Sequence, residues 1–215
     1  MFAKAVFLDK DGTLIENVPY NVDPKKIRLL EGVAEGLQLL HAAGFQLHVI
    51  TNQAGVAQGR FKEEALSLVE ARLRQLLAEA GAPLSGFYYC PHHPDGRVLR
   101  YRAHCFCRKP NPGLLFQAAR EHEINLAASW FVGDILNDVE AGRRADCRTV
   151  LINNGNETEW NLSGLRMPHF TVANFQEAVE AILSVENLRV PPLSTAIPIQ
   201  LPRSKAANSN LHASI

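Results

Sequence analysis

The fold of this chain is decided by the stretch Phe7-Leu8-Asp9-Lys10-Asp11-Gly12-Thr13-Leu14. Its first two residues, Phe7 and Leu8, complete the apolar run 5–8, which is typical of a buried strand. Asp9 and Asp11 follow where that strand stops, and side chains two residues apart on an extended chain point the same way. Two like charges so close require a cation or a shared proton, and a divalent ion with oxygen ligands meets that requirement. The stretch therefore predicts a strand that ends in a cation site.

Segments typical of strands and of helices alternate along the rest of the chain. After the first strand, we expect strands at residues 47–50, 86–89, 130–132, 149–152 and 170–172. We expect helices at residues 31–43, 62–80, 112–121 and 136–145, and a last helix that Asn174 caps and that ends near Val185. This alternation predicts a three-layer α/β fold, a Rossmann-like parallel sheet with helices on both faces.

Reactive side chains fall where the expected strands end. Asp9 and Thr51 stand directly after an apolar run, and Asp134 follows another with only Gly133 between them. In open parallel sheets, ligands bind beyond the carboxyl ends of the strands. These side chains are therefore expected to share one site.

The first stretch, taken as Asp-x-Asp-Gly-Thr-Leu after an apolar strand, resembles the first motif of the haloacid dehalogenase superfamily of phosphatases. The resemblance implies that Asp9 attacks phosphorus and that Asp11 acts as general acid and then as general base. An aspartyl-phosphate intermediate would divide a very slow hydrolysis into two easier steps. The alternative is a capped turn after a strand, where Asp and Gly are common.

Two further segments resemble the second and third motifs of the superfamily. The second motif corresponds to Val49-Ile50-Thr51-Asn52-Gln53, and the resemblance implies that the Thr51 hydroxyl binds the transferring phosphoryl group. Arg108-Lys109-Pro110 implies that Lys109 neutralises phosphate charge. The alternatives are an ordinary β-branched residue at the end of a strand, and a solvated basic pair before a helix.

Gly133-Asp134 resembles the fourth motif. It implies that Asp134 completes a Mg²⁺ site with Asp9 and the backbone carbonyl of Asp11. Asp138 stands four residues after Asp134, near the expected helix N-terminus. We expect it to support the site with its carboxylate rather than to bind Mg²⁺ directly. Each motif is weak alone, but the order of the four favours the superfamily strongly.

Three cysteines and a histidine form two close pairs, Cys90 with His92 and Cys105 with Cys107. Three sulfurs and one nitrogen fit a closed tetrahedral Zn²⁺ site, which is structural because it has no open position. Thiolates select zinc over magnesium, so the two metals need not compete. His93 is adjacent and offers an alternative ligand. The other alternative is a coincidental group of buried cysteines.

The zinc pattern also narrows the resemblance. Over about residues 3–183, the chain resembles the subgroup of heptose bisphosphate and histidinol-phosphate phosphatases. The segments that carry this resemblance are Tyr88-Tyr89-Cys90-Pro91-His92-His93-Pro94 and Cys105-Phe106-Cys107-Arg108-Lys109-Pro110. The resemblance favours His92 as the zinc ligand. It implies as substrate the 7-phosphate of D-glycero-D-manno-heptose 1,7-bisphosphate, with histidinol phosphate or another sugar phosphate as alternatives.

The same resemblance indicates which residues contact the substrate. These are Asn17, Tyr20, Asn52, Gln53 and Arg108. Two residues depart from the pattern of the heptose phosphatases: Pro19 stands where they usually have Gly, and Gln58 replaces an Arg common there. These departures put the preference for heptose bisphosphate in doubt.

Composition and charge limit the remaining possibilities. The chain has 215 residues, with 22 basic and 22 acidic side chains and a pI near 7.1. This balance argues against a nucleic acid or membrane partner, and the resemblance implies a small phosphorylated metabolite instead. Without a signal-peptide pattern or a long apolar run, we expect a cytoplasmic protein, by default a monomer.

Spacing predicts how the chain is divided. We expect one phosphatase domain over residues 1–186, with a zinc loop at 90–107, no large cap domain, and an extended or disordered tail at 187–215. The cleft would then be open, and loops would determine its specificity. The alternative from a different class is a zinc-stabilised interaction domain with a vestigial site.

Overall fold

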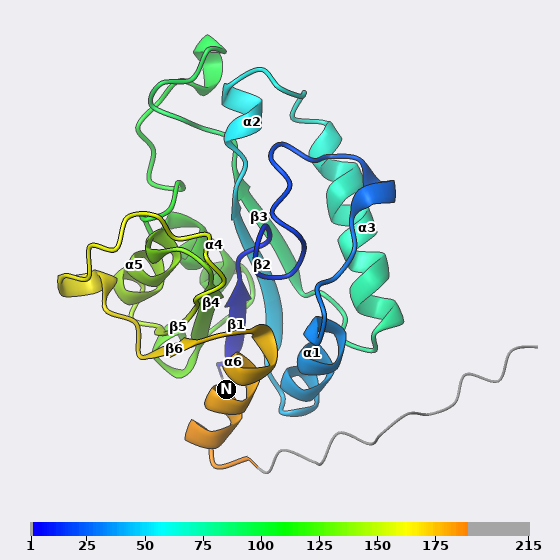
Figure 1. The fold of residues 1–215 in the computed structure, drawn as a ribbon, viewed down its shortest axis with the longest axis vertical. Helices are drawn as coiled ribbons and strands as arrows, with labels where there is room; N and C mark the ends of the chain where they lie inside the picture. Colours follow the sequence, from blue (N-terminus) through cyan, green and yellow to red (C-terminus); the bar gives the residue numbers. More distant parts are fainter. Residues whose placement is uncertain (1, 189–215) are drawn as a thin grey trace, which may run out of the picture.

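A computed structural model describes residues 2–188 of the chain. Its centre is one sheet of six parallel strands in the order β3-β2-β1-β4-β5-β6 (Figure 1). The strands are β1 Ala5–Leu8, β2 Gln46–Asn52, β3 Gly86–Cys90, β4 Trp130–Gly133, β5 Arg148–Ile152 and β6 Phe170–Val172. The parallel sheet and all six expected strands are confirmed.

The strand order places a switch point beside β1. From β1 the chain builds the sheet outward through β2 and β3, and then returns to the other side of β1 with β4. Leu8, the last residue of β1, pairs in register with Val49 on one side and Val132 on the other. Crossovers that leave in opposite directions open a crevice at the carboxyl ends of these strands. Asp9 is therefore placed at the centre of the sheet edge where ligands bind.

Helices cover both faces of the sheet (Figure 1). They are α1 Val33–Ala42, α2 Ala54–Ala57, α3 Ala65–Glu79, α4 Gly113–Glu121, α5 Leu136–Arg144 and α6 Phe175–Val185. Short 3₁₀ helices lie at η1 Pro24–Lys26, η2 Leu99–Tyr101, η3 Leu126–Ala128 and η4 Gly164–Arg166.

Alternation along β1 explains how the two layers form. Val6 and Leu8 pack into the core that α1, α3 and α6 complete, while Ala5 and Phe7 pack with α4 and α5 on the opposite face. All four side chains are fully buried, so β1 is apolar throughout, as a central parallel strand requires. The polar residues of this segment are thereby restricted to the end of the strand.

The structure differs from the sequence expectation in two places. The helix expected at 62–80 begins at Ala65, and α2 was not expected. A single helical turn is too short to show a hydrophobic period, so its sequence gives no signal. Of the tail expected at 187–215, residues 189–215 lie outside the described residues. Within the described part of the chain, every helix is too short or too polar to cross a lipid bilayer.

Candidate active site and metal sites

A buried lysine joins the carboxyl ends of β1 and β2. Lys109 is 2 % exposed, and its Nζ forms ion pairs with Asp9 and, at 2.6 Å, with Asp138. The same Nζ donates a hydrogen bond to the carbonyl of Ile50 at 2.9 Å. Burial alone would lower the pKa of Lys109, but the carboxylates of Asp138 and Asp9 raise it above its usual value. The ammonium therefore stays charged beside Asp9.

Asp134 joins the two carboxylates that pair with that ammonium. Asp9, Asp134 and Asp138 are all buried, and their oxygens lie within 4.8 Å of one another. Burial, followed by the charges of Asp9 and Asp138, raises the pKa of Asp134 to about 7. Burial likewise raises the pKa of Asp138 to about 6, against the opposing effect of Lys109. One ammonium cannot balance three carboxylates, so the donor set fits a divalent cation with oxygen ligands.

The partners of Asp138 distinguish its role from that of Asp134. One oxygen of Asp138 accepts the backbone N–H of Ile135 at 3.2 Å and the other pairs with Lys109, so it closes the first turn of α5. Asp9 and Asp134 lie close enough together to bind one ion. Asp138 lies in the same cluster, and its role as a supporting carboxylate rather than a metal ligand stays a prediction.

Asp11 has a cation of its own. Lys10 Nζ lies 2.6 Å from Asp11 Oδ1, and Lys10 is only 1 % exposed although it is a lysine. Burial raises the pKa of Asp11 and the Lys10 charge opposes that rise. A carboxyl group with a raised pKa is suited to giving and taking a proton. Asp9 and Asp11 thus face separate cations in one site.

Gln53 connects the ends of β1 and β2. Its Nε2 donates to Thr51 Oγ1 at 2.9 Å and to Asp11 Oδ2 at 3.2 Å. Because the Thr51 oxygen accepts from Gln53, its own proton is free to be donated to a bound anion. Thr51 is 1 % exposed and lies at the floor of the site.

The residues expected to contact substrate lie in different places. Tyr20, Asn52 and Gln53 line a cavity of about 140 Å³ together with Asp11. Arg108 and Lys109 line a separate cavity of about 210 Å³, and Asn17 is exposed outside both. The side-chain amide of Asn52 is occupied by the backbone of Lys109. The structure thus gives Asn52 a supporting contact, and its substrate contact remains a prediction.

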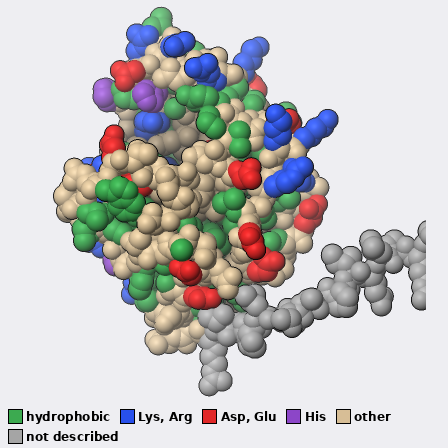
Figure 2. All heavy atoms as spheres, viewed as in Figure 1, with side chains coloured by type: hydrophobic (Ala, Val, Ile, Leu, Met, Phe, Trp, Pro, Cys, Tyr) green, Lys and Arg blue, Asp and Glu red, His purple; other side chains and the backbone are tan. Residues whose placement is uncertain are grey.

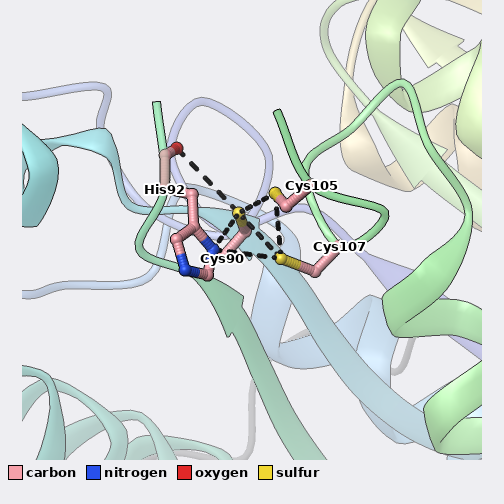
Figure 3. Close-up of side chains that lie close together, drawn as sticks. All are labelled: Cys90, His92, Cys105 and Cys107. Atoms are coloured by element: carbon pink, nitrogen blue, oxygen red, sulfur yellow. Dashed lines mark hydrogen bonds between the residues drawn. The ribbon is translucent and has the colours of Figure 1, made fainter. Parts of the chain in front are cut away.

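The Cys/His cluster forms a second polar centre at the end of β3 (Figure 3). The sulfurs of Cys90, Cys105 and Cys107 lie 3.1–3.5 Å apart, and His92 Nδ1 lies 3.4 Å from Cys107 Sγ and 3.7 Å from Cys90 Sγ. A tetrahedral zinc site with Zn–S near 2.3 Å places its sulfurs about 3.8 Å apart. The four side chains therefore have a suitable spacing to hold a metal ion.

The pKa values of the three clustered thiols move in opposite directions. A hydrogen bond with Cys107, and then burial, raises the pKa of Cys90, and burial raises the pKa of Cys105. Hydrogen bonds from Cys90, and then from Cys105 and His92, lower the pKa of Cys107 to about 5 against the effect of burial. The thiolate is the form of cysteine that binds metals. All four cysteines of the chain are free of disulfides, and Cys147 is buried elsewhere, under α5.

The sequence interpretation assigned no role to two features of this site. One is the buried ion pair of Lys10 with Asp11; the other is the Asn-rich segment 153–160, whose Asn156 donates to Asp134 Oδ2 at 2.7 Å. The segment follows directly after a strand, so its position and composition could have indicated the second feature. A lysine between two aspartates gives no such signal, because only folding shows that it is buried.

This fold and this site define a class of hydrolase, and comparison with known proteins agrees. A family model described as HAD-hydrolase-like matches residues 106–178. A D-glycero-β-D-manno-heptose-1,7-bisphosphate 7-phosphatase from Yersinia pestis is 41 % identical over 152 residues, which cover 70 % of this chain and 81 % of the relative. The chain therefore belongs to the haloacid dehalogenase-like family of phosphatases, which are phosphoric monoester hydrolases.

Solved structures show the same fold. A HAD-like phosphatase from Mesorhizobium loti superposes with a TM-score of 0.73 at 30 % identity, covering 86 % of this chain and 88 % of the other. A D,D-heptose 1,7-bisphosphate phosphatase from B. bronchiseptica, in complex with magnesium and phosphate, superposes with a TM-score of 0.72 at 29 % identity, covering 85 % and 99 %.

Proposed function

We propose that this protein is a Mg²⁺-dependent phosphatase that removes the 7-phosphate of D-glycero-β-D-manno-heptose 1,7-bisphosphate. The observation that carries the proposal is the buried ion pair of Lys109 with Asp9 inside a cluster of three carboxylates. A nucleophilic carboxylate can approach an anionic ester only where cations offset the repulsion. The similarity to the Yersinia pestis and B. bronchiseptica heptose phosphatases supports the choice of substrate.

The reaction proceeds in two displacements. The Asp9 carboxylate attacks phosphorus, the bond from phosphorus to the sugar oxygen breaks, and Asp11 gives its proton to the leaving alkoxide. Asp11 then takes a proton from water, which attacks the aspartyl-phosphate and releases inorganic phosphate. Asp9 is regenerated as a carboxylate and Asp11 as an acid. Lys109 and the Thr51 hydroxyl hold the phosphoryl oxygens throughout.

Asp9, Asp134 and the backbone carbonyl of Asp11 would hold Mg²⁺. The bound ion would shield the Asp9 carboxylate from the negative charge of the phosphate. The residues themselves supply the rest: Asp138 keeps Lys109 charged, and Gln53 orients Thr51 and Asp11.

Cys90, His92, Cys105 and Cys107 would hold a structural Zn²⁺. Lys109 follows Cys107 by two residues, and Arg108 between them donates to the carbonyl of His92 at 3.3 Å. A metal at this cluster would fix the segment that carries Lys109. Thiols that remain reduced are typical of cytoplasmic proteins, so we place the enzyme in the cytoplasm. We propose that it acts as a monomer.

The surroundings of the site suit a small anionic substrate. Tyr20 and Gln53 on one side and Arg108 on the other can contact the sugar and its second phosphate. Lys and Arg side chains gather on the upper part of the face seen in Figure 2, over the region where Figure 1 places α2 and the beginning of α3. Positive charge near the cleft raises the encounter rate with a bisphosphate.

The test compares phosphate release from heptose 1,7-bisphosphate, histidinol phosphate and p-nitrophenyl phosphate, with and without Mg²⁺. We expect the highest kcat/KM for the heptose, by at least about tenfold, and none without Mg²⁺. Asp9→Asn should reduce turnover at least about 10³-fold with an unchanged circular dichroism spectrum. Asp146→Asn is the matched control, because Asp146 is exposed at the far end of α5.

Other outcomes would point to the alternatives. A higher kcat/KM for histidinol phosphate than for the heptose would identify the protein as a histidinol-phosphate phosphatase. Full activity in Asp9→Asn would show that the nucleophile is assigned wrongly. A protein that binds both metals but hydrolyses no phosphate ester would be the vestigial interaction domain.

A further inference from the structure

The segment between β5 and β6 crosses the carboxyl end of the sheet (Figure 1, yellow). Its first residues, Asn153-Asn154-Gly155-Asn156-Glu157, have no part in the mechanism above. Three of its side chains nevertheless form hydrogen bonds to the elements that carry the candidate metal ligands.

The first contact is to a candidate ligand itself. Asn156 Nδ2 donates to Asp134 Oδ2 at 2.7 Å. The hydrogen bond engages one carboxylate oxygen and leaves the other free of this contact. An amide fits here because it donates a hydrogen bond without adding another negative charge to the carboxylate cluster. The donor therefore restricts rotation of the Asp134 carboxylate.

This pair lies directly against the turn after β1. A Cβ at Gly12 would lie 2.0 Å from Asp134 Oδ2 and 2.5 Å from Asn156 Nδ2, so no other residue fits at this position. Gly12 also has a φ of +84°, which favours glycine. The backbone that follows Asp11 is thus packed against the Asp134–Asn156 hydrogen bond.

The second contact fixes that turn from the other side. Asn154 Nδ2 donates to the Gly12 carbonyl at 2.7 Å, and Asn154 Oδ1 accepts the backbone N–H of Asn156 at 3.2 Å. The two asparagines are therefore linked to each other, and one holds Gly12 while the other holds Asp134. Through them the ends of β1 and β4 are connected by a third segment.

The third contact is at the start of α5. Glu157 Oε2 accepts the backbone N–H of Leu136 at 2.5 Å. Leu136 is the first residue of α5 and lies two residues after Asp134. A carboxylate that accepts a free N–H at a helix N-terminus stabilises it, and here it also holds the backbone next to Asp134.

We propose that residues 154–157 are a positioning element of the Mg²⁺ site, in which Asn156 sets the orientation of Asp134 and Asn154 sets the turn that carries Asp11. The proposal rests on the proposed function, since it assumes that Asp134 binds the metal. The proposed mechanism assigns neither asparagine a contact with the reacting phosphate. Residues that support metal ligands in this way typically contribute about 10–100-fold to metal affinity.

The test measures Mg²⁺ affinity directly rather than activity. Dialysed protein that retains zinc is titrated with MgCl₂ by isothermal calorimetry, and the Mg²⁺-dependent rise in melting temperature is recorded in parallel. The variants are Asn156→Ala and Asn156→Leu, the second of which retains the side-chain volume without the donor. Asn153→Ala is the matched control, since Asn153 is exposed on the same segment and its side chain forms no hydrogen bond with the described residues. Asp134→Asn identifies the site.

We expect both Asn156 variants to weaken Mg²⁺ binding about 10–100-fold, Asn153→Ala to stay within about twofold of wild type, and Asp134→Asn to abolish binding. Circular dichroism and zinc content show whether each variant folds. Wild-type affinity in a folded Asn156→Leu protein would overturn the positioning proposal and leave the proposed function intact. Equal Mg²⁺ binding by wild type and Asp134→Asn would overturn both.

Discussion

Asn52 holds the backbone of Lys109 at two points. Its Oδ1 accepts the Lys109 N–H at 3.0 Å and its Nδ2 donates to the Lys109 carbonyl at 3.1 Å, across 57 residues of sequence. Asn52 is the last residue of β2, next to Thr51. The strand that carries Thr51, whose hydroxyl is proposed to bind the phosphoryl group, therefore also sets the position of the lysine.

Replacing Asn52 tests this relationship. In Asn52→Ala the two backbone groups lose their partners, so we expect unfolding free energy to fall by about 1–3 kcal/mol and kcat by about 10–100-fold. Steady-state kinetics and urea unfolding measure both. A residue that only bound substrate would instead raise KM with kcat unchanged. Asn111→Ala, which removes one hydrogen bond to the Cys105 carbonyl, is the comparison variant from the same region.

The Lys109–Asp138 ion pair can be separated from the chemistry by a double substitution. Lys109→Met leaves three buried carboxylates without their ammonium, and we expect it to cost about 3–5 kcal/mol of stability and at least about 10³ in kcat.

Adding Asp138→Leu to Lys109→Met removes one of the three buried carboxylates and leaves Asp9 and Asp134. We expect part of the stability to return but none of the activity, as measured by urea unfolding and phosphate release. Recovery of activity in the double variant would show that the lysine acts only through the fold.

The zinc proposal predicts a metal content. Purified protein should contain about one zinc per chain, and Cys107→Ser should reduce this to near zero. Loss of zinc releases the segment before Lys109, so kcat should fall at least about tenfold and the melting temperature should drop. Cys147→Ala is the control, because Cys147 is buried away from the cluster. Full zinc content in Cys107→Ser would assign the metal to other ligands.

A buried histidine predicts acid sensitivity. His48 on β2 is fully buried, and burial, with the nearby charges of His122 and Arg74, lowers its pKa from 6.5 to about 3. The unfolded chain takes up a proton near pH 6.5 that the folded protein does not. The neutral His48 therefore makes its full contribution to stability above pH 6.5. As the pH falls toward 3 this contribution is lost, and the free energy of unfolding decreases by on the order of 5 kcal/mol.

Comparing His48→Phe with wild type measures this contribution. We expect the variant to lose less stability between pH 6.5 and 4, as followed by urea unfolding at each pH. His41→Phe, on the exposed side of α1, should keep the wild-type pH dependence. An equal pH slope in His48→Phe and wild type would mean that other groups cause the acid sensitivity.

The sequence predicted the layers and the location of the site well, for identifiable reasons. Apolar runs such as 5–8 are long enough to mark strands, and the helices show a clear hydrophobic period. In a parallel sheet the carboxyl ends share one edge, so the positions of Asp9, Thr51 and Asp134 along the chain were enough to group them in one site. The Cys/His group was anticipated because its residue types and spacing are typical of zinc ligands, and Asp9 and Asp134 because of their places at strand ends and the resemblance to the superfamily; the structure brings each set together.

The sequence did not indicate the contacts that hold these groups in place. Asn52 was assigned to the substrate, yet its amide binds Lys109. The burial of Lys10, and the hydrogen bonds of Asn154 and Asn156, were not anticipated. Each depends on a pairing of side chains from distant segments, which local patterns do not encode.

The sequence by itself determined where the strands lie and which residue types stand at their ends. Local hydrophobic patterns mark the strands, and the residue type determines the chemistry that a side chain can perform. Only the tertiary structure decided which cation faces which carboxylate: Lys109 reaches Asp9 and Asp138, while Lys10 turns to Asp11. The physical reason is burial. Charges taken out of water must find partners within a few ångströms, and only the packed sheet and its loops fix which partners lie that close.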